Sequence, residues 1–285
     1  MSTEGVLYIA FGWPYLMMAI HSARTFRATN PGRGITILSD VALDPIMAIS
    51  DYRPNMDRWI VVQDSPEKNR LYKTSANLHS PYERTLLLDS DTVVLGDLSV
   101  PFRLLDFADI LVKLDPKGQN RPWQRDESVL DVGRMADLPS WNGGVVFFRR
   151  GAGSESFFKR WKEGFVARDS PYDQPALAEA ILSTHVRLLP LDERWNCPTG
   201  RFYRSGGTRG PVQILHYMSR APEHVVRDIR RCSAELSAGH EAEHRGLSEW
   251  MKARTEGARG AARGRNLPAP WWRRSAPRVR GGRSS

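Results

Sequence analysis

A run of apolar residues that ends in two aspartates constrains this chain more than any other segment. Residues 84–88 read Arg-Thr-Leu-Leu-Leu and are followed at once by Asp89, Ser90 and Asp91. Three consecutive leucines at this place are typical of a strand buried on both faces of a mainly parallel sheet. Ligand sites of such sheets lie beyond the carboxyl ends of the strands. The segment therefore predicts an α/β fold with a polar site after this strand.

Strand-like and helix-like segments alternate up to about residue 250. Short apolar runs predict further strands at residues 6–11, 35–38, 59–62, 110–113, 144–148, 187–190 and 213–216. Helices are expected from Pro14 to about Arg27 and near residues 68–78. Ser154 is a suitable N-cap for a helix with aromatic residues at core spacing. The pattern predicts a three-layer α/β domain over residues 1–250.

The net charge of +9 belongs to the C-terminal end of the chain. Residues 252–285 carry ten basic residues and one acidic residue, so residues 1–251 are neutral with 31 of each. Five glycines, three prolines and no hydrophobic period predict a disordered basic tail over residues 251–285. Its Trp271 and Trp272 beside two arginines suit a membrane surface or an acidic partner, although a solvated extension is the commoner outcome. A nucleic-acid partner is not expected of the neutral domain.

The cysteine content and the apolar runs indicate the cellular compartment in which the protein is expected. Two cysteines, Cys197 and Cys232, make neither a disulfide framework nor a four-ligand zinc site, so we expect a reducing, cytoplasmic setting. The longest apolar stretch covers residues 7–20 and is interrupted by Gly12 and Pro14. It is too short and too broken to cross a bilayer, and it has no basic segment before it as a secretory signal has.

The two aspartates after the apolar run have the spacing of a metal site. Alternate side chains of an extended chain point the same way, so Asp89 and Asp91 can converge on one ion. Carboxylate oxygens suit Mg²⁺ or Mn²⁺, and these ions keep positions open for phosphate oxygens. The alternative is a turn in which the aspartates cap the backbone.

The segment from residue 73 to residue 95 resembles the nucleotide-sugar site of GT-A glycosyltransferases. It is most similar to the retaining enzymes of the glycogenin and bacterial lipopolysaccharide galactosyltransferase type. Four further blocks stand in the family's order, at residues 140–147, 172–177, 191–196 and 214–217. The resemblance covers about residues 5–225 and implies a GT-A fold with a mixed, mainly parallel sheet. It also implies a nucleotide-sugar donor, UDP-linked, and a bound Mn²⁺ (or Mg²⁺).

The resemblance assigns roles to individual residues. It implies that Asp89 and Asp91 hold the metal and that His216 completes its protein ligands, as an imidazole suits Mn²⁺ better than Mg²⁺. It places the nucleotide against Phe11, Tyr15, Lys73 and Ser90. It places the donor sugar against Asn142, Gly143 and Gly144, and it puts the catalytic groups at Asp173 and Gln174.

Most of these residues also have a structural alternative. Phe11 could pack a helix start on the core, Lys73 could be solvated, and His216 could be a hydrogen-bonded core histidine. Residues 142–144 could form a turn entering a strand. Pro175 predicts a helix start with Gln174 as the cap and Asp173 just outside it, which would account for both residues without catalysis.

The chain departs from the family at two places. The family often has a lysine after its histidine that contacts the diphosphate; here only Arg220 or Arg209 could serve. Residues 11–14 replace a usual polar stretch, which leaves the base preference open. Residues 115–139 with Trp123, residues 200–210 and the tail are candidates for shaping the acceptor site.

The function predicted from these features is metal-dependent transfer of a sugar from a UDP-linked donor to an acceptor hydroxyl, with retention. The first alternative is a nucleotidyltransferase, which would need a glycine-rich basic loop where residues 11–14 stand. The second is a non-catalytic nucleotide- or glycan-binding protein on the same scaffold. A third, nucleic-acid binding through the tail, would be strongly dependent on salt.

Overall fold

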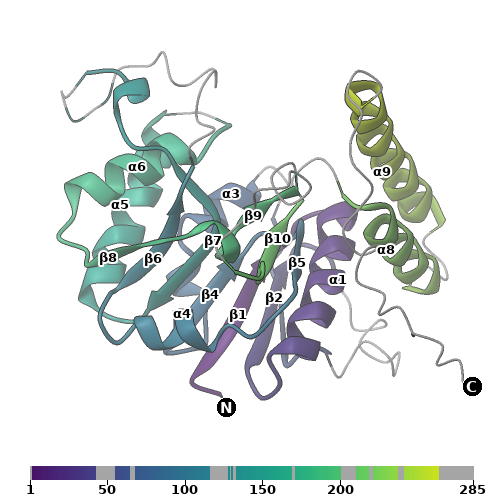
Figure 1. Cartoon of the computed structure of the whole chain (residues 1–285), viewed down its shortest axis with the longest axis horizontal. Coiled ribbons are helices and arrows are strands. Elements are labelled where there is room, and N and C mark those ends of the chain that lie inside the picture. Colours follow the sequence, from purple (N-terminus) through teal and green to yellow (C-terminus); the bar gives the residue numbers. More distant parts are fainter. Residues whose placement is uncertain are drawn as a thin grey trace, which may run out of the picture.

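A seven-stranded mixed sheet lies at the centre of the structure, a computed structural model (Figure 1). The structure describes residues 2–42, 55–64, 68–115, 128, 130, 133–168, 171–199, 210–217, 221–236 and 241–262. The sheet order is β3-β2-β1-β4-β7-β6-β8. The strands are β1 (Glu4–Ile9), β2 (Gly34–Ser39), β3 (Arg58–Val61), β4 (Arg84–Leu88), β6 (Ile110–Leu114), β7 (Trp141–Arg149) and β8 (Leu188–Leu191).

The strand directions make the sheet mainly parallel. β1 is parallel to β2 and to β4, β2 is parallel to β3, and β6 is parallel to β8. β7 runs antiparallel to both of its neighbours, β4 and β6. A second, three-stranded sheet has the order β5-β10-β9, with β5 (Thr92–Val94), β9 (Cys197–Pro198) and β10 (Ile214–His216). The mixed, mainly parallel α/β sheet confirms the predicted fold class.

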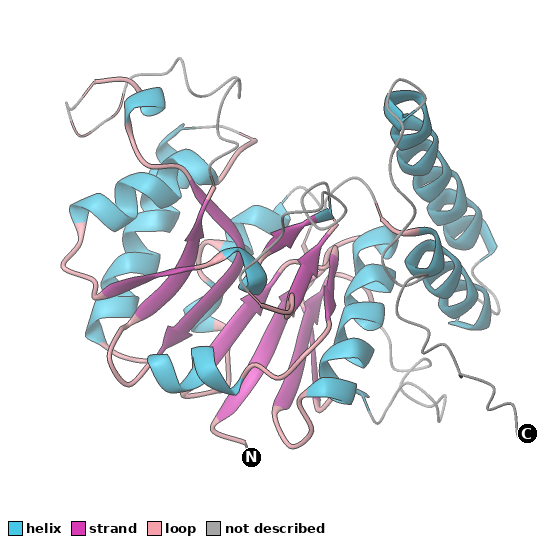
Figure 2. Ribbon diagram, viewed as in Figure 1, coloured by secondary structure: helices cyan, strands magenta, loops and turns pink. Residues whose placement is uncertain are grey.

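Helices cover both faces of the large sheet (Figure 2). α1 (Trp13–Thr29), α4 (Ser99–Leu104), α8 (Glu223–Leu236) and α9 (Glu241–Ala262) contribute to one core. α5 (Ala152–Arg168) and α6 (Gln174–Ser183) pack together over the other, and α3 (Asn69–Lys73) with the 3₁₀ turn η3 (Ala76–Leu78) lies on this side. Two further 3₁₀ turns within the described residues are η5 (Met135–Asp137) and η6 (Glu193–Trp195).

The central strands alternate between the two cores, as the apolar runs predict. In β4, Leu86 and Leu88 enter one core and Leu87 the other. In β1, Val6 and Tyr8 face the α1 side while Leu7 and Ile9 face the α5 side. A strand of nearly continuous apolar character is therefore buried on both faces, with its carboxyl end left for polar residues.

Three local predictions need correction. The helix expected at residues 68–78 is broken into α3 and η3, because Thr74 and Ser75 direct their hydroxyls to the carbonyl of Leu71. Ser154 is not the N-cap of α5: it lies in the first turn, and its Oγ donates to the carbonyls of Arg149 and Gly151.

The start of α6 also differs from the prediction. The carbonyl of Asp173 accepts the first helical hydrogen bond, from the Leu177 amide at 3.0 Å, so Asp173 is the cap and Gln174 the first helical residue. Pro175 is tolerated one position later because the amides of the whole first turn lack helical partners. Residues 142–144, for which a turn was the alternative, lie within β7.

The C-terminal helix crosses the boundary expected at residue 250. α9 continues to Ala262, so the first residues of the expected disordered tail are helical, and residues 263–285 lie outside the described part. The division at residue 250 therefore falls within a helix, and the rest of the tail stays a prediction. Within the described ranges, no helix combines the length and apolar character that crossing a membrane needs.

Candidate functional site

Three side chains with metal-binding atoms meet at the carboxyl end of β4. Asp89 and Asp91 follow β4, His216 ends β10, and their ligand atoms all lie within 4.8 Å of one another. The antiparallel pairing of β10 with β5 places His216 opposite Thr92, and the amide of Tyr217 donates to the carbonyl of Asp91 at 3.0 Å. The small sheet therefore carries the histidine to the two aspartates.

Opposite charges control protonation within this cluster. His216 Nε2 lies 3.2 Å from Asp91 Oδ1 and 3.9 Å from Asp89 Oδ2. Burial lowers the pKa of His216, but the two aspartates outweigh burial and hold that pKa above its ordinary value. Burial likewise raises the pKa of Asp91, but His216 outweighs it and the net pKa lies below the usual range. The cluster is an electronegative position that favours a bound proton or metal cation beside Nε2.

Gly144 provides the space that this cluster occupies. A Cβ at residue 144 would stand 2.3 Å from His216 Cε1 and 2.7 Å from Asp89 Oδ2. The carbonyl of Gly144 also accepts the Asp89 amide at 2.8 Å, which ties β7 to the end of β4. A Cβ at Gly143 would meet Leu177 Cδ2 at 3.3 Å, a contact that a small shift relieves. Of the two glycines, Gly144 is thus the one that the aspartate–histidine cluster requires.

A buried lysine connects the cluster to the start of α6. Lys73 ends α3, and its Nζ lies 2.8 Å from Asp89 Oδ1 and 3.5 Å from Asp173 Oδ2. Burial lowers the pKa of Lys73, but Asp173 and then Asp89 outweigh it and keep the ammonium charged. The solvated-lysine alternative is therefore wrong. Asp173 Oδ2 and Gln174 Oε1 are buried without a hydrogen-bond partner among the described residues.

Two asparagines link the histidine to β7. Asn142 Oδ1 accepts from the Gly144 amide at 2.9 Å and from Asn196 Nδ2 at 3.1 Å. Asn196 Oδ1 lies 3.1 Å from His216 Nδ1, and Asn196 is fully buried. Asn196 closes one of the sequence blocks, but its position in the chain does not indicate a role. Only the fold shows that it contacts both Asn142 and His216.

The predicted nucleotide residues occupy different surroundings. Phe11 is buried, and its ring lies 5.0 Å from that of Tyr72, which agrees with the packing alternative. Tyr15 is 41% exposed, with its ring 5.9 Å from that of Trp250 in α9. Ser90 is buried between the two aspartates.

An aspartate outside the predicted site residues supports the loop after β1. The Gly12 amide donates to Asp40 Oδ1 at 2.7 Å, and Gly12 has a φ of 76°, which favours glycine. Asp40 directly follows β2, so its position repeats that of Asp89 after β4. Asp40 could have been selected from the sequence because it is an acidic residue at the end of a buried parallel strand.

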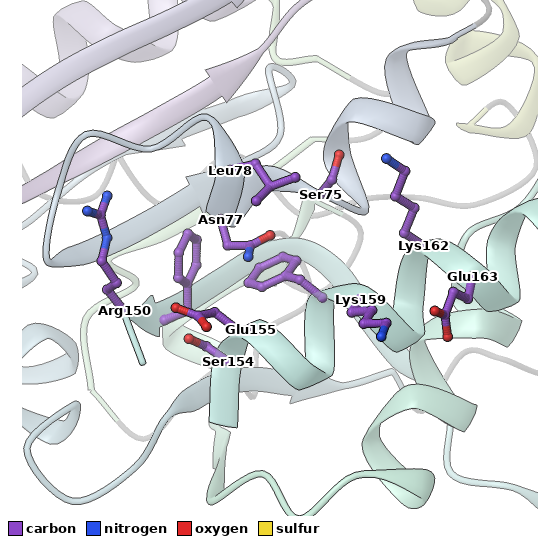
Figure 3. Close-up of a pocket in the computed structure, with 11 residues that line it drawn as sticks. Ser75, Asn77, Leu78, Arg150, Ser154, Glu155, Lys159, Lys162 and Glu163 are labelled. Carbon is purple, nitrogen blue, oxygen red and sulfur yellow. The ribbon is translucent and has the colours of Figure 1, made fainter. Parts of the chain in front are cut away.

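A cavity of about 690 Å³ opens away from these residues, between η3 and α5 (Figure 3). Leu78, Phe148 and Phe158 give it an apolar surface, and charged residues of α5 together with Arg150 surround it. None of the predicted site residues lines it, so it is separate from the cluster at the end of β4.

Several predicted contributors lie outside the described residues. They include residues 200–209 of the suggested acceptor loop, Trp123, and the paired tryptophans of the tail. Arg209 and Arg220, the two arginines considered for the diphosphate, also fall there.

Comparisons with known proteins agree with this geometry. Residues 84–218 match the family model of nucleotide-diphospho-sugar transferases. No curated protein matches the sequence. The galactosyltransferase LgtC, solved with donor and acceptor sugar analogues, is similar with a TM-score of 0.58 and 14% identity, over 85% of this chain and 99% of that one.

Two further solved structures share the fold. Apo GlyE, a glycosyltransferase of Streptococcus pneumoniae, has a TM-score of 0.56 and 17% identity, over 88% of this chain and 64% of its own. Mouse xyloside xylosyltransferase 1 has a TM-score of 0.50 and 13% identity, over 75% of this chain and 98% of its own. Residues 84–218 are therefore similar to nucleotide-diphospho-sugar transferases, and the chain shares its fold with these solved glycosyltransferases.

Proposed function

We propose that the enzyme transfers a sugar from a UDP-linked donor to an acceptor hydroxyl, with a divalent cation and with retention of the anomeric configuration. The observation that carries this proposal is the convergence of Asp89, Asp91 and His216 at the carboxyl end of β4. Ligands bind at this edge in parallel α/β sheets, and two carboxylates with an imidazole are a donor set for one divalent ion.

The residues present suit Mn²⁺ (or Mg²⁺). Asp89 and Asp91 supply hard oxygen ligands, and His216 supplies the Nε2 atom that faces them. Metal ligands must be deprotonated, and the lowered pKa of Asp91 keeps its carboxylate ionised. A divalent ion held there would neutralise the diphosphate and stabilise the charge that develops on the departing nucleotide.

Lys73 adds a fixed positive charge beside the same site. Its ammonium contacts Asp89 and Asp173, so it is oriented before any substrate arrives. A preoriented cation stabilises developing negative charge without the cost of reorganising during the reaction. Asn142, Gly143 and Gly144 on the neighbouring strand would let a sugar ring approach the backbone, with amide groups to meet its hydroxyls.

Asp173 and Gln174 are the proposed catalytic pair. In the described part of the chain, Gln174 Oε1 is buried without a hydrogen-bond partner, and Asp173 Oδ2 makes no hydrogen bond but lies 3.5 Å from the Lys73 ammonium; sugar hydroxyls would satisfy such acceptors. The Trp161 indole donates to the Asp173 carbonyl at 3.0 Å, which holds the start of α6 in place. Retention has two routes: attack by the acceptor on the face of the leaving group, or a transient glycosyl ester on Asp173.

The comparisons favour transfer of a sugar over both alternatives. The matched family is one of nucleotide-diphospho-sugar transferases, which argues against a nucleotidyltransferase and a non-catalytic binding protein. The loop after β1 agrees, because Phe11 is buried and the Gly12 amide is used by Asp40, so this loop is not a phosphate cradle. The UDP preference, the role of the basic tail at a membrane surface or acidic partner, and the cytoplasmic setting stay predictions.

A donor screen tests the proposal. The protein would be incubated with Mn²⁺ and, separately, with UDP-glucose, UDP-galactose, UDP-xylose, UDP-N-acetylglucosamine and GDP-mannose, while nucleotide release is measured. We expect metal-dependent release of UDP from one of the UDP-sugars and its loss on chelation. Absence of nucleotide release from every donor would reject the proposal.

Retention needs a separate measurement, since donor hydrolysis does not report it. With an acceptor in hand, NMR of the first product should show the anomeric configuration of the donor. An inverted product would reject retention while leaving the assignment of the donor intact.

A further inference from the structure

The hydrogen bonds around Asn142 determine the orientation of its side-chain amide. The Gly144 backbone amide can only donate, and it points to Asn142 at 2.9 Å. The Asn142 atom at that position must therefore be the oxygen, Oδ1. The assignment of Asn142 Oδ1 is firm because the hydrogen of the Gly144 backbone amide has a single possible position.

The orientation of Asn142 in turn determines that of Asn196. The Asn196 side-chain atom that lies 3.1 Å from Asn142 Oδ1 must donate to it, so it is Nδ2. The opposite atom of the same amide, Oδ1, then faces His216 Nδ1 at 3.1 Å. Because an amide oxygen can only accept, the proton of this hydrogen bond belongs to His216 Nδ1.

With a proton fixed on Nδ1, Nε2 is the His216 atom that can carry either a second proton or a metal ion. Nε2 points toward the carboxylates of Asp91 and Asp89, at 3.2 and 3.9 Å. A bare nitrogen lone pair next to two carboxylates is repulsive, so Nε2 needs a proton or a metal ion between it and them. Nδ1 keeps its hydrogen in both cases, since Asn196 Oδ1 accepts it.

We propose that Asn196 is a positioning residue that holds the proton of His216 on Nδ1 and thereby presents Nε2 as the metal ligand. The inference rests on the proposed function, because it assumes that Asp89, Asp91 and His216 bind the divalent ion. Hydrogen bonds from the second nitrogen of a ligating histidine set its tautomer and orientation, and their loss typically weakens metal binding 10- to 100-fold.

Two contacts and complete burial hold Asn196 in this position. β9 begins at the next residue and pairs in parallel with β10, with Cys197 opposite Leu215, which holds the main chain of Asn196 next to the strand that ends at His216. Lys113 Nζ donates to the Asn196 carbonyl at 2.9 Å. Asn196 has no exposed surface, so water cannot replace its amide as the partner of Nδ1.

The first experiment measures the protonation of the His216 ring directly. Long-range ¹H–¹⁵N NMR of the protein, metal-free and loaded with diamagnetic Zn²⁺ as a probe, distinguishes the two nitrogens. We expect Nδ1 to carry a proton in both forms, and we expect the metal to replace the proton on Nε2, which is released to solvent. An unprotonated Nδ1 in either form would overturn the proposal, and this measurement needs no variant.

The second experiment measures Mn²⁺ affinity from the EPR signal of the free ion, without any donor. Asn196→Ala should weaken Mn²⁺ binding roughly 10- to 100-fold. Asn30→Ala is the matched control, because Asn30 is equally buried and uses its amide to bind the Gly96 carbonyl and the Leu98 amide, outside the metal cluster. It should change Mn²⁺ affinity less than twofold.

The outcomes separate this inference from the proposed function. Wild-type affinity in Asn196→Ala, or equal losses in both variants, would reject the positioning role even if the protein releases UDP. Weaker binding in Asn196→Ala alone, with no nucleotide released from any donor, would support the positioning role and reject the transferase assignment. If Asn196→Ala does not fold, the NMR of the wild-type ring still decides.

Discussion

Two histidines that are almost equally buried have opposite protonation behaviour. His216, at the end of β10, is 4% exposed, and His21, in α1, is 6% exposed. The pKa of His216 is raised by its two aspartates, whereas burial lowers the pKa of His21 to about 4. Burial alone therefore does not determine the charge of a buried histidine.

The difference lies in the carboxylates that each ring faces. Asp91, next to His216, has a side chain only 21% exposed, so its charge is weakly screened. Among the described residues, the carboxylate paired with His21 is that of Asp228 in α8, with Oδ2 at 4.0 Å from Nε2, and the Asp228 side chain is 44% exposed. The neighbouring Arg24 and His224 also disfavour the charged form. The end of β4 is thus a charged centre that accepts a cation, and the contact of α1 with α8 excludes one.

The largest expected effect comes from removing a carboxylate of the charged centre. Asp91→Asn keeps the shape of the side chain but removes its charge, and a bound metal is worth several kcal/mol in such reactions. Metal-dependent release of UDP should fall by about 10³-fold. Initial rates at saturating Mn²⁺ measure this. Asp228→Asn, beside the other histidine, should keep the rate within about twofold; equal losses in both variants would contradict the distinction between the regions.

Removing the buried lysine should have the next largest effect. Lys73→Met leaves Asp173 and Asp89 without their cation, and breaking a buried ion pair on one side typically costs 3–5 kcal/mol. Because Asp89 is partly exposed, we expect the free energy of unfolding to fall by about 3 kcal/mol in urea titrations. Lys68→Met breaks only the ion pair between the exposed Lys68 and Asp64, so the urea concentration at the midpoint of unfolding should stay unchanged.

Acid should destabilise the protein through His21. Its folded pKa of about 4 lies below the unfolded value of about 6.5, so the unfolded state binds a proton first as the pH falls. This contribution to stability is complete above pH 6.5 and is lost as the pH falls toward 4. The whole loss is about 3 kcal/mol.

The variant His21→Leu isolates that contribution. It should lack this part of the pH dependence. Its free energy of unfolding should therefore rise relative to that of the wild type as the pH decreases from 6.5 to 4. Thermal unfolding of both proteins at several pH values gives the difference. A constant difference across this range would show that His21 does not titrate as described.

The smallest effect distinguishes two adjacent glycines. Gly144→Ala places a Cβ within 2.3 Å of the His216 ring, and such overpacking typically costs about 2 kcal/mol. It should also weaken Mn²⁺ binding, because the ring must move. Gly143→Ala meets only Leu177 and Trp161 at 3.3 Å or more and should retain Mn²⁺ affinity. Equal Mn²⁺ affinities in the two variants would contradict the proposed contact.

Local sequence predicts some parts of this protein well and others poorly. The strand ending at Leu88 follows from its own residues, because alternate side chains must enter opposite cores. Helix starts are less predictable: Ser154 and Pro175 both fit a start, yet the first turns begin elsewhere, because several first-turn positions tolerate the same residues. Asp89 and Asp91 could be selected from the sequence by their position, but the contacts of Lys73 with Asp89 and Asp173 could not.

The sequence by itself determined the buried central strands, the paired aspartates that follow one of them, and the neutral domain with a basic C-terminal end. These features depend on residues that are neighbours in the chain, where strand periodicity and local charge suffice. The tertiary structure decided that His216 contacts Asp91 across 125 positions, and that Asn196 lies behind its ring. It also decided that His216 and His21 have opposite pKa shifts, since protonation depends on the charges brought together by folding.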